Sequence, residues 1–175
     1  LPDRPEFVWT WFGAARVGAV ITMVNPLLPV ADYEYYLDYT RARVAVVHES
    51  LLETFAQAAA SARYLRAVLV AGDQPHLPET ESVRWARFSE TVQQMPAECS
   101  PADTRRDDIA IWLFTSGSTG HPKGAVHLQH DLPYNTEVFA KATMGVNADD
   151  LTVSVPKLFF GYATGTNLLF PFAVG

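Results

Sequence analysis

The sequence contains one cysteine, Cys99, among its 175 residues. No internal disulfide can therefore form, and no cysteine cluster can hold a metal ion. A chain without disulfides suits a reducing compartment, so we expect a cytoplasmic protein. We also expect no metal site at His127 and His130, because these two histidines span the end of a predicted strand and the start of a predicted helix.

Long apolar runs and basic stripes are also missing. No apolar segment approaches the roughly 20 residues that a membrane-spanning helix needs, and the first residues do not resemble a signal peptide. The formal net charge is −6, and Arg105-Arg106 is followed at once by Asp107-Asp108. We therefore predict neither membrane insertion nor nucleic-acid binding. Because the chain begins without methionine and stops on Gly175, we expect a piece of a longer protein.

Helical and strand patterns alternate along a chain of ordinary globular composition, with 49% hydrophobic and 18% charged residues. The spacing of apolar residues predicts helices over 5–17, 32–40, 50–62 and 130–143. It predicts strands over 19–24, 43–47, 67–70, 109–114, 125–128 and 151–155. We expect an α/β fold of three layers, a mainly parallel sheet with helices on both faces. Residues 1–175 would form one subdomain with an irregular segment at 73–106, in which four prolines stand and a short helix at 88–94 is expected.

The segment from Thr115 to Gly124 is rich in hydroxyl groups and glycine, and it follows a hydrophobic strand. Gly117 and Gly120 allow a close backbone approach and positive φ, so that successive N–H groups can point into one concavity. Lys123 adds a positive charge, and no carboxylate intervenes. Four hydroxyl donors complete the pattern: Thr115, Ser116, Ser118 and Thr119. We predict that this segment binds phosphate groups.

The segment is not a P-loop, since that pattern requires G-x-x-x-x-G-K-[ST] and then a helix. Pro122 stands five residues after Gly117, and a strand is expected to follow. A flexible Ser/Gly surface turn is the alternative interpretation. The Pro-Lys-Gly ending would be surplus in such a turn, and it favours a binding role.

Thr115 to Gly124 resembles the phosphate-binding signature of the acyl-CoA synthetase, adenylation-domain and luciferase superfamily. Further similarities follow in the order of that superfamily's first half, at Arg4-Pro5-Glu6-Phe7, Gly18-Ala19-Val20, Asn25-Pro26 and Asp107-Asp108-Ile109-Ala110. The resemblance implies that the chain is a subdomain from the N-terminal part of a larger adenylate-forming enzyme. It also implies that the segment from Thr115 to Lys123 binds ATP, with Lys123 as a catalytic residue.

A second segment, Lys157 to Tyr162 with Gly165 and Asn167, is similar to the benzoate-CoA ligase group. The superfamily lines its acyl pocket with this stretch, so the resemblance implies that Phe160, Gly161 and Tyr162 bind the substrate. Gly161 departs from the alanine of that group, and the missing methyl group would leave room for a ring substituent. The alternative is that these residues are core, which we favour for the neighbouring Leu158 and Phe159.

The activity implied by the resemblance is ATP-dependent conversion of an aryl carboxylic acid to its acyl-adenylate, followed by thioester formation with coenzyme A. The acid would be benzoate or an amino- or hydroxybenzoate such as 2-aminobenzoate, and ATP, Mg²⁺ and coenzyme A would be the cofactors. Two alternatives remain, namely an adenylation domain that loads a carrier protein and a non-catalytic nucleotide-binding module. The superfamily's magnesium-binding glutamate, ribose-binding aspartate and second catalytic lysine are not found, so we expect residues 1–175 alone to be inactive.

Overall fold

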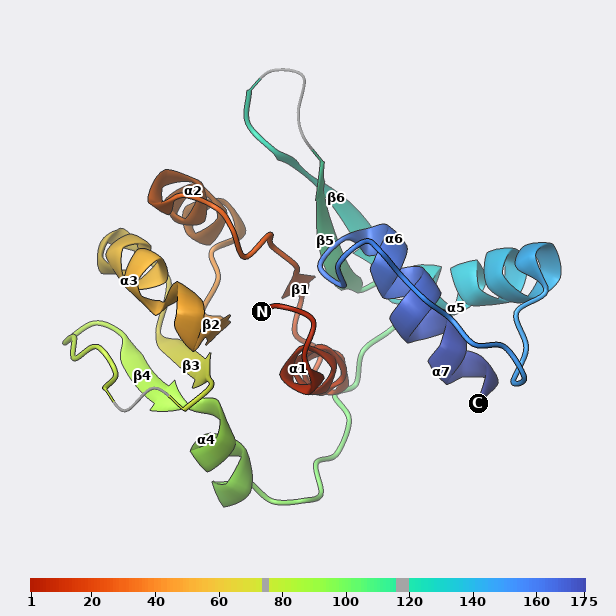
Figure 1. Ribbon diagram of the computed structural model, residues 1–175, viewed down its shortest axis with the longest axis horizontal. Coiled ribbons are helices and arrows are strands. Elements are labelled where there is room, and N and C mark those ends of the chain that lie inside the picture. Colours follow the sequence, from red (N-terminus) through yellow and green to blue (C-terminus); the bar gives the residue numbers. More distant parts are fainter. Residues whose placement is uncertain (74–75, 116–119) are drawn as a thin grey trace. The chain divides into compact units, whose positions relative to one another are not determined.

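The structure is a computed structural model that describes residues 1–73, 76–115 and 120–175. The chain divides into two compact units, and Figure 1 labels their elements. The first unit contains Leu1 and residues 26–99, and the second contains residues 2–25 and 100–175. That the whole chain forms one subdomain of a larger enzyme stays a prediction.

The first unit is built on a parallel three-stranded sheet in the order β2-β3-β4. Its strands are β2 (Val44–His48), β3 (Ala67–Ala71) and β4 (Arg84–Arg87). Its helices are α2 (Val30–Thr40), the 3₁₀ turn η1 (Glu49–Leu51), α3 (Leu52–Ser61) and α4 (Phe88–Gln94). In register, Val44 pairs with Ala67 and His48 with Ala71. Parallel strands need a crossover connection, and α3 provides it between β2 and β3.

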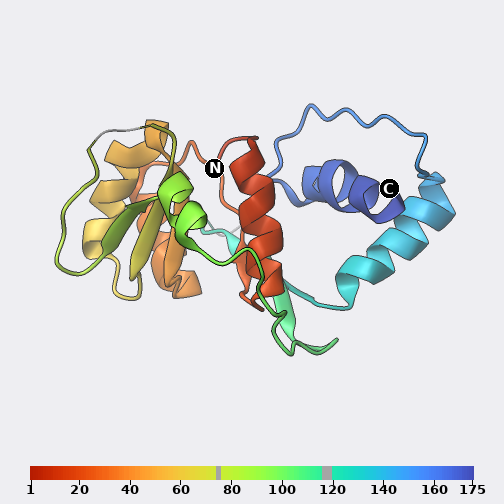
Figure 2. The same cartoon turned by 90° about the horizontal axis from the view of Figure 1, so that it is seen from below.

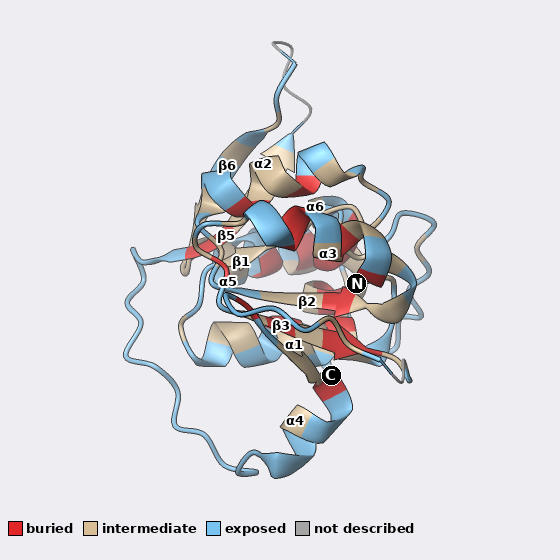
Figure 3. Ribbon diagram, turned by 90° about the vertical axis from the view of Figure 1, so that its left-hand side faces the viewer, coloured by how far each residue is buried: buried red, intermediate tan, exposed pale blue. Residues whose placement is uncertain are grey.

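Apolar side chains of both strands and helices form the core of this unit. Val68 and Val70 of β3 are 0% and 2% exposed, and Phe55 of α3 is 4% exposed. Tyr33 and Leu37 of α2 are also buried, which their four-residue spacing predicts. Figure 3 shows helices that carry buried residues on one side and exposed residues on the other. Each fully buried side chain of this size contributes about 1.5–3 kcal/mol.

The second unit contains a three-stranded sheet in the order β1-β5-β6. Its strands are β1 (Ile21–Thr22), β5 (Ile109–Thr115) and β6 (Lys123–Leu128). β1 is parallel to β5, and β6 is antiparallel to β5. Its first helix is α1 (Pro5–Arg16). The helix α5 (Asp131–Asn135) continues into the π-helical η2 (Thr136–Met144). The helix α6 (Gly161–Thr164) continues through the π-helical η3 (Gly165–Leu169) into α7 (Phe170–Val174). Figure 2 shows the cyan and blue helices near each other, while residues 145–160 connect them through an open arc.

Gly18 follows the end of α1 with φ +71°, a left-handed conformation that glycine adopts without a steric penalty. A Cβ atom at this position would lie 2.9 Å from Cγ2 of Thr104 and 3.0 Å from Cβ of Ala102. The turn therefore needs glycine for both its backbone angle and its close neighbours. This agrees with the helix end that the sequence predicts there.

The predicted α/β class with mainly parallel sheets is confirmed, since three of the four strand pairings among the described residues are parallel. The strands form two three-stranded sheets in place of one. β6 is antiparallel because only residues 116–122 connect it to β5, and a parallel partner would need a longer crossover.

Two elements differ from the sequence-based expectation. The strand predicted over residues 151–155 is wrong, because this segment has no strand structure. Its apolar residues Leu151, Val153 and Val155 are 98%, 92% and 89% exposed. A strand needs a neighbour for its backbone hydrogen bonds, and the described strands pair elsewhere. Conversely, β4 was not predicted, because its Arg-Trp-Ala-Arg sequence lacks the apolar run of the inner strands.

Candidate active site

The loop with the phosphate-binding pattern joins β5 and β6. Thr115 is the last residue of β5 and pairs across the hairpin with Lys123, the first residue of β6. The base of β5 is held in the core, where Ala110 and Ile111 are each 3% exposed, while Thr115 at the other end is exposed. The two strands thus hold both ends of the loop together. Four of the predicted phosphate-binding residues lie outside the described residues: Ser116, Gly117, Ser118 and Thr119.

Gly120 and Lys123 are described, and both suit an anion. Gly120 has φ +97°, and a Cβ atom built there would meet no atom of the described residues within 4 Å. The backbone is therefore open to a ligand at this point and adopts an angle that favours glycine. Lys123 is exposed, and within the described ranges its ammonium group forms no ion pair, whereas Lys141 and Lys157 pair with carboxylates. Its charge is available to neutralise a phosphate group.

The segment before α6 is anchored at Leu158 from two directions. The backbone N–H of Leu158 donates to Oδ1 of Asp3 at 2.9 Å. The hydroxyl of Thr164, a residue that is 2% exposed, donates to the carbonyl oxygen of Leu158 at 2.6 Å. The ammonium of Lys157 lies 3.8 Å from the same aspartate. These contacts fix the position of the chain where the predicted substrate-binding residues begin.

The three predicted substrate-binding residues have different surroundings. Phe160 precedes α6, is 52% exposed, and has its ring centroid 4.3 Å from that of Phe159. Tyr162 is 69% exposed. Gly161 lies against β5, where an added Cβ atom would come within 2.7 Å of Cδ1 of Leu113. The space of the missing methyl group is therefore filled by Leu113, so the expected room for a ring substituent beside Gly161 is not there.

Gly161 lines a pocket of about 350 Å³, and Phe160 and Tyr162 do not. The pocket has mainly apolar walls with a few polar groups, which is typical of small-molecule sites. Its apolar lining comes from the residue after β1 and from β5, α5 and η3: Met23, Ile111, Leu113, Leu132 and Leu169. Its polar side chains include His127, Asp131 and Asn135.

His127 and Asp131 form a pair that the sequence analysis did not identify as part of a site. His127 is near the end of β6 and Asp131 begins α5, and Nδ1 of the imidazole lies 3.3 Å from Oδ2 of the carboxylate. The backbone N–H of Leu128 donates to the same oxygen. This hydrogen bond is the main reason that the pKa of the Asp131 carboxyl is lowered. In the sequence, the four-residue spacing of His127 and Asp131 was the signal from which this pair could have been found.

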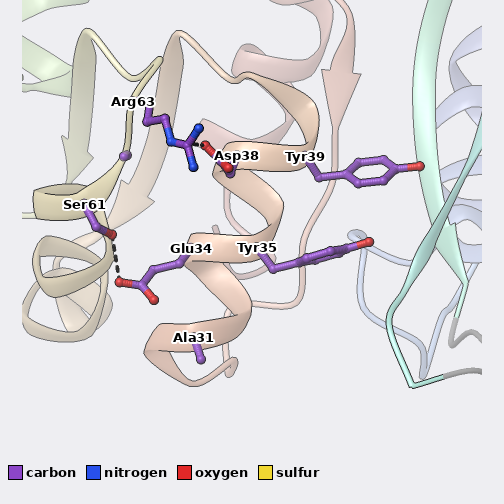
Figure 4. A pocket seen from close by; sticks show the side chains of 8 residues that line it. Ala31, Glu34, Tyr35, Asp38, Tyr39, Ser61 and Arg63 are labelled. Atoms are coloured by element: carbon purple, nitrogen blue, oxygen red, sulfur yellow. Dashed lines mark hydrogen bonds and ion pairs between the residues drawn. The ribbon is translucent and has the colours of Figure 1, made fainter.

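A second pocket, of about 570 Å³, lies in the first unit between α2 and α3 (Figure 4). Tyr35 and Tyr39 project from the same side of α2, with ring centroids 5.4 Å apart. Its charged groups already have partners, because Glu34 accepts from the hydroxyl of Ser61 and Asp38 pairs with Arg63. This groove contains none of the residues that the sequence predicted for binding.

Comparison with known proteins identifies the family. The model of the AMP-binding enzyme family matches residues 1–175. The chain belongs to this family. The resemblance to adenylate-forming enzymes is thereby confirmed.

Two curated relatives of this AMP-binding chain are aryl-CoA ligases. A benzoate–CoA ligase of Thauera aromatica is 39% identical over 173 residues, covering 99% of the chain. A 4-hydroxybenzoate–CoA/benzoate–CoA ligase of Rhodopseudomonas palustris is 34% identical over 100% of the chain. The chain spans 31% of the length of each.

Solved structures agree with the sequence comparison. The anthranilate CoA ligase AuaEII in complex with anthranoyl-AMP matches with a TM-score of 0.91 and 33% identity, over 99% of this chain and 32% of that one. A benzoate CoA ligase from Burkholderia xenovorans LB400 matches with a TM-score of 0.83 and 33% identity, again over 99% and 32%. In the part of the chain that the structure describes, no helix is both long and apolar enough to span a bilayer, and no three His, Cys, Asp or Glu side chains are grouped to hold a metal ion.

Proposed function

We propose that the intact protein activates an aryl carboxylic acid with ATP and transfers the acyl group to coenzyme A. The observation that carries this proposal is the 39% identity to a benzoate–CoA ligase over nearly the whole chain. The hairpin supports it, because an open Gly120 and an exposed Lys123 stand where a phosphate-binding segment is expected.

In the first step, the substrate carboxylate attacks the α-phosphorus of ATP and pyrophosphate leaves. Both reactants are anions, so the enzyme must neutralise them and hold them in line. Lys123 and the backbone N–H groups near Gly120 are suited to hold the β- and γ-phosphates as charge develops on the leaving group. One positioned donor of this kind contributes about 3–4 kcal/mol to transition-state stabilisation. Mg²⁺ bound with ATP would share the charge, and the described residues offer no cluster of their own to hold it.

For the acid, we propose a benzoate with a small amino or hydroxyl substituent. The pocket beside Gly161 has apolar walls that suit a flat ring, and its volume of about 350 Å³ lies in the usual range for small-molecule sites. Relatives with this fold include ligases named for benzoate, 4-hydroxybenzoate and anthranilate. Of the residues predicted to bind the acid, Gly161 has the clearest geometric support.

The test is acid-dependent pyrophosphate exchange by the intact enzyme. Benzoate and its amino and hydroxy derivatives should support exchange, whereas fatty acids and amino acids should not. Coenzyme A should then release AMP and form the thioester. Exchange with aryl acids but transfer only to a carrier protein would identify an adenylation domain, and no exchange with any acid would leave only nucleotide binding. A cytoplasmic location also stays a prediction.

A further inference from the structure

The pocket beside Gly161 contains one imidazole, that of His127. His127 and its partner Asp131 both line the pocket, whose walls are otherwise largely apolar. Their side chains are 41% and 36% exposed, so a ligand in the pocket can reach them. A polar pair in an apolar pocket is the kind of group that fixes the orientation of a ligand and provides specificity.

Asp131 determines which hydrogen bond the imidazole can offer. A carboxylate only accepts, so the contact of 3.3 Å between Oδ2 and Nδ1 of His127 places a proton on Nδ1. In the neutral ring, Nε2 then carries the lone pair and accepts a hydrogen bond.

The carboxylate of Asp131 is itself held in place on both oxygens. Its Oδ2 accepts the backbone N–H of Leu128 at 3.0 Å, and its Oδ1 lies 3.2 Å from Nε2 of His130. These contacts fix the orientation of the carboxylate and, through it, that of the His127 ring. His130 does not line the pocket.

We propose that His127 is a specificity-determining residue, which accepts a hydrogen bond from an amino or hydroxyl substituent on the aromatic ring, and that Asp131 is its positioning residue. This inference rests on the proposed aryl-acid function. It places the recognition of the substituent on β6 and α5, outside the segment from Phe160 to Tyr162. A methyl group has nearly the shape of an amino group but donates no hydrogen bond, so His127 should distinguish the two.

The experiment compares amino- and methylbenzoates in the intact enzyme. For each ring position, kcat/KM is measured for the aminobenzoate and for the corresponding methylbenzoate, with benzoate as reference. We expect the parent enzyme to prefer the amino compound by about tenfold or more at one ring position. His127→Leu should reduce that ratio to about threefold or less, and His127→Gln, which retains an acceptor, should keep part of it.

The variants of neighbouring residues separate positioning from folding. Asp131→Asn should lower the amino-to-methyl ratio mainly through a higher KM for the amino compound, because the imidazole is no longer held in one tautomer. His130→Leu is the matched comparison, since it removes the other imidazole from the same carboxylate but lies off the pocket, and it should lower the ratio less than Asp131→Asn does. If His127→Leu fails to fold, His127→Phe, which keeps a ring, takes its place.

Each outcome has one meaning. Equal losses of kcat/KM for amino and methyl compounds in His127→Leu would show a structural role and overturn the inference. A parent enzyme that activates benzoate but prefers no amino compound at any position would also overturn it, and the proposed activation of aryl acids would stand. An intact enzyme that activates no aryl acid would instead refute the proposed function itself.

Discussion

Gly161 and Leu113 are in such close contact that a Cβ atom on Gly161 would lie 2.7 Å from Cδ1 of Leu113. Real Cβ atoms do not approach other atoms this closely, so a methyl group there would displace the end of the leucine side chain. Both residues line the same pocket of about 350 Å³. The glycine therefore determines where Leu113 lies, and Leu113 in turn forms the pocket wall.

The first prediction follows from this contact. Gly161→Ala should push Leu113 towards the pocket and shift the kcat/KM ratio of the intact enzyme from 2-aminobenzoate or a hydroxybenzoate towards benzoate. A change of methylene size corresponds to about 1–3 kcal/mol of discrimination. Steady-state kinetics with these acids in both forms of the enzyme measure the shift.

A double-mutant cycle tests whether Leu113 transmits the effect. Adding Leu113→Val to Gly161→Ala should restore much of the ratio, because the shorter side chain leaves space for the methyl group. Gly165→Ala is the control, since it lines the same pocket but its added methyl would meet the ring of Phe170. An unchanged ratio in Gly161→Ala would show that this wall does not contact the substrate.

The second prediction concerns the hairpin loop. Gly120→Val introduces a β-branched residue at φ +97°, and Lys123→Ala removes an exposed charge. Each should slow adenylate formation at least about tenfold, which corresponds to roughly 1.4 kcal/mol. Pyrophosphate exchange measures the rate.

Two matched variants control for general damage. Lys141→Ala removes a lysine that pairs with Glu137 on η2, and Gly13→Val alters a glycine of α1 whose Cβ position is also open. Both should exchange pyrophosphate at close to the parental rate. Normal exchange in Gly120→Val and Lys123→Ala would remove the phosphate-binding role from this loop.

Much of this fold could be predicted from local patterns. The helices α1, α2 and α3 and the strands β2, β3 and β5 each follow from a periodic apolar pattern within one segment. A strand also depends on a neighbour, which local patterns do not supply, and this is why residues 151–155 were assigned a strand that they do not form.

The candidate site also has some features that lie within one segment of the sequence and others that depend on contacts between segments. The phosphate-binding role of the loop at Gly120 and Lys123 stays a prediction, and it rests on consecutive residue types within one segment. The contact between Gly161 and Leu113 and the pocket position of His127 could not be predicted, since both depend on segments brought together by folding.

The third prediction concerns residues 1–175 expressed alone. The chain spans 31% of the length of its curated relatives and contains the hairpin and the residues that line the pocket. We expect it to show no acid-dependent release of pyrophosphate and to bind ATP only weakly, because most of a catalytic site has to be held in place at once. Titration with ATP and a coupled pyrophosphate assay would measure both, with the intact enzyme as the positive control. Clear turnover would mean that a third of the length suffices for the chemistry.

The fourth prediction concerns the hydroxyl of Thr164, which donates to the carbonyl of Leu158 at 2.6 Å in the interior of the second unit. Thr164→Val keeps the shape of the side chain but leaves a part-buried carbonyl with a lost partner, which costs about 1–3 kcal/mol. Thr164→Ser keeps the hydroxyl and should be less destabilising. Thr166→Val is the matched control, because its hydroxyl donates to the carbonyl of Tyr162 at an exposed position, where the cost should stay within about 0.5 kcal/mol.

Urea unfolding of the intact enzyme measures these stabilities, and kcat/KM for the aryl acid measures the effect on the site. Leu158 lies two residues before Phe160, so loosening it should lower kcat/KM in Thr164→Val, whereas kcat/KM should stay unchanged in Thr166→Val. If the two valine variants unfold at the same urea concentration, the bond to Leu158 contributes nothing measurable. If Thr164→Val is destabilised with kcat/KM intact, the bond holds the fold together but does not position the substrate.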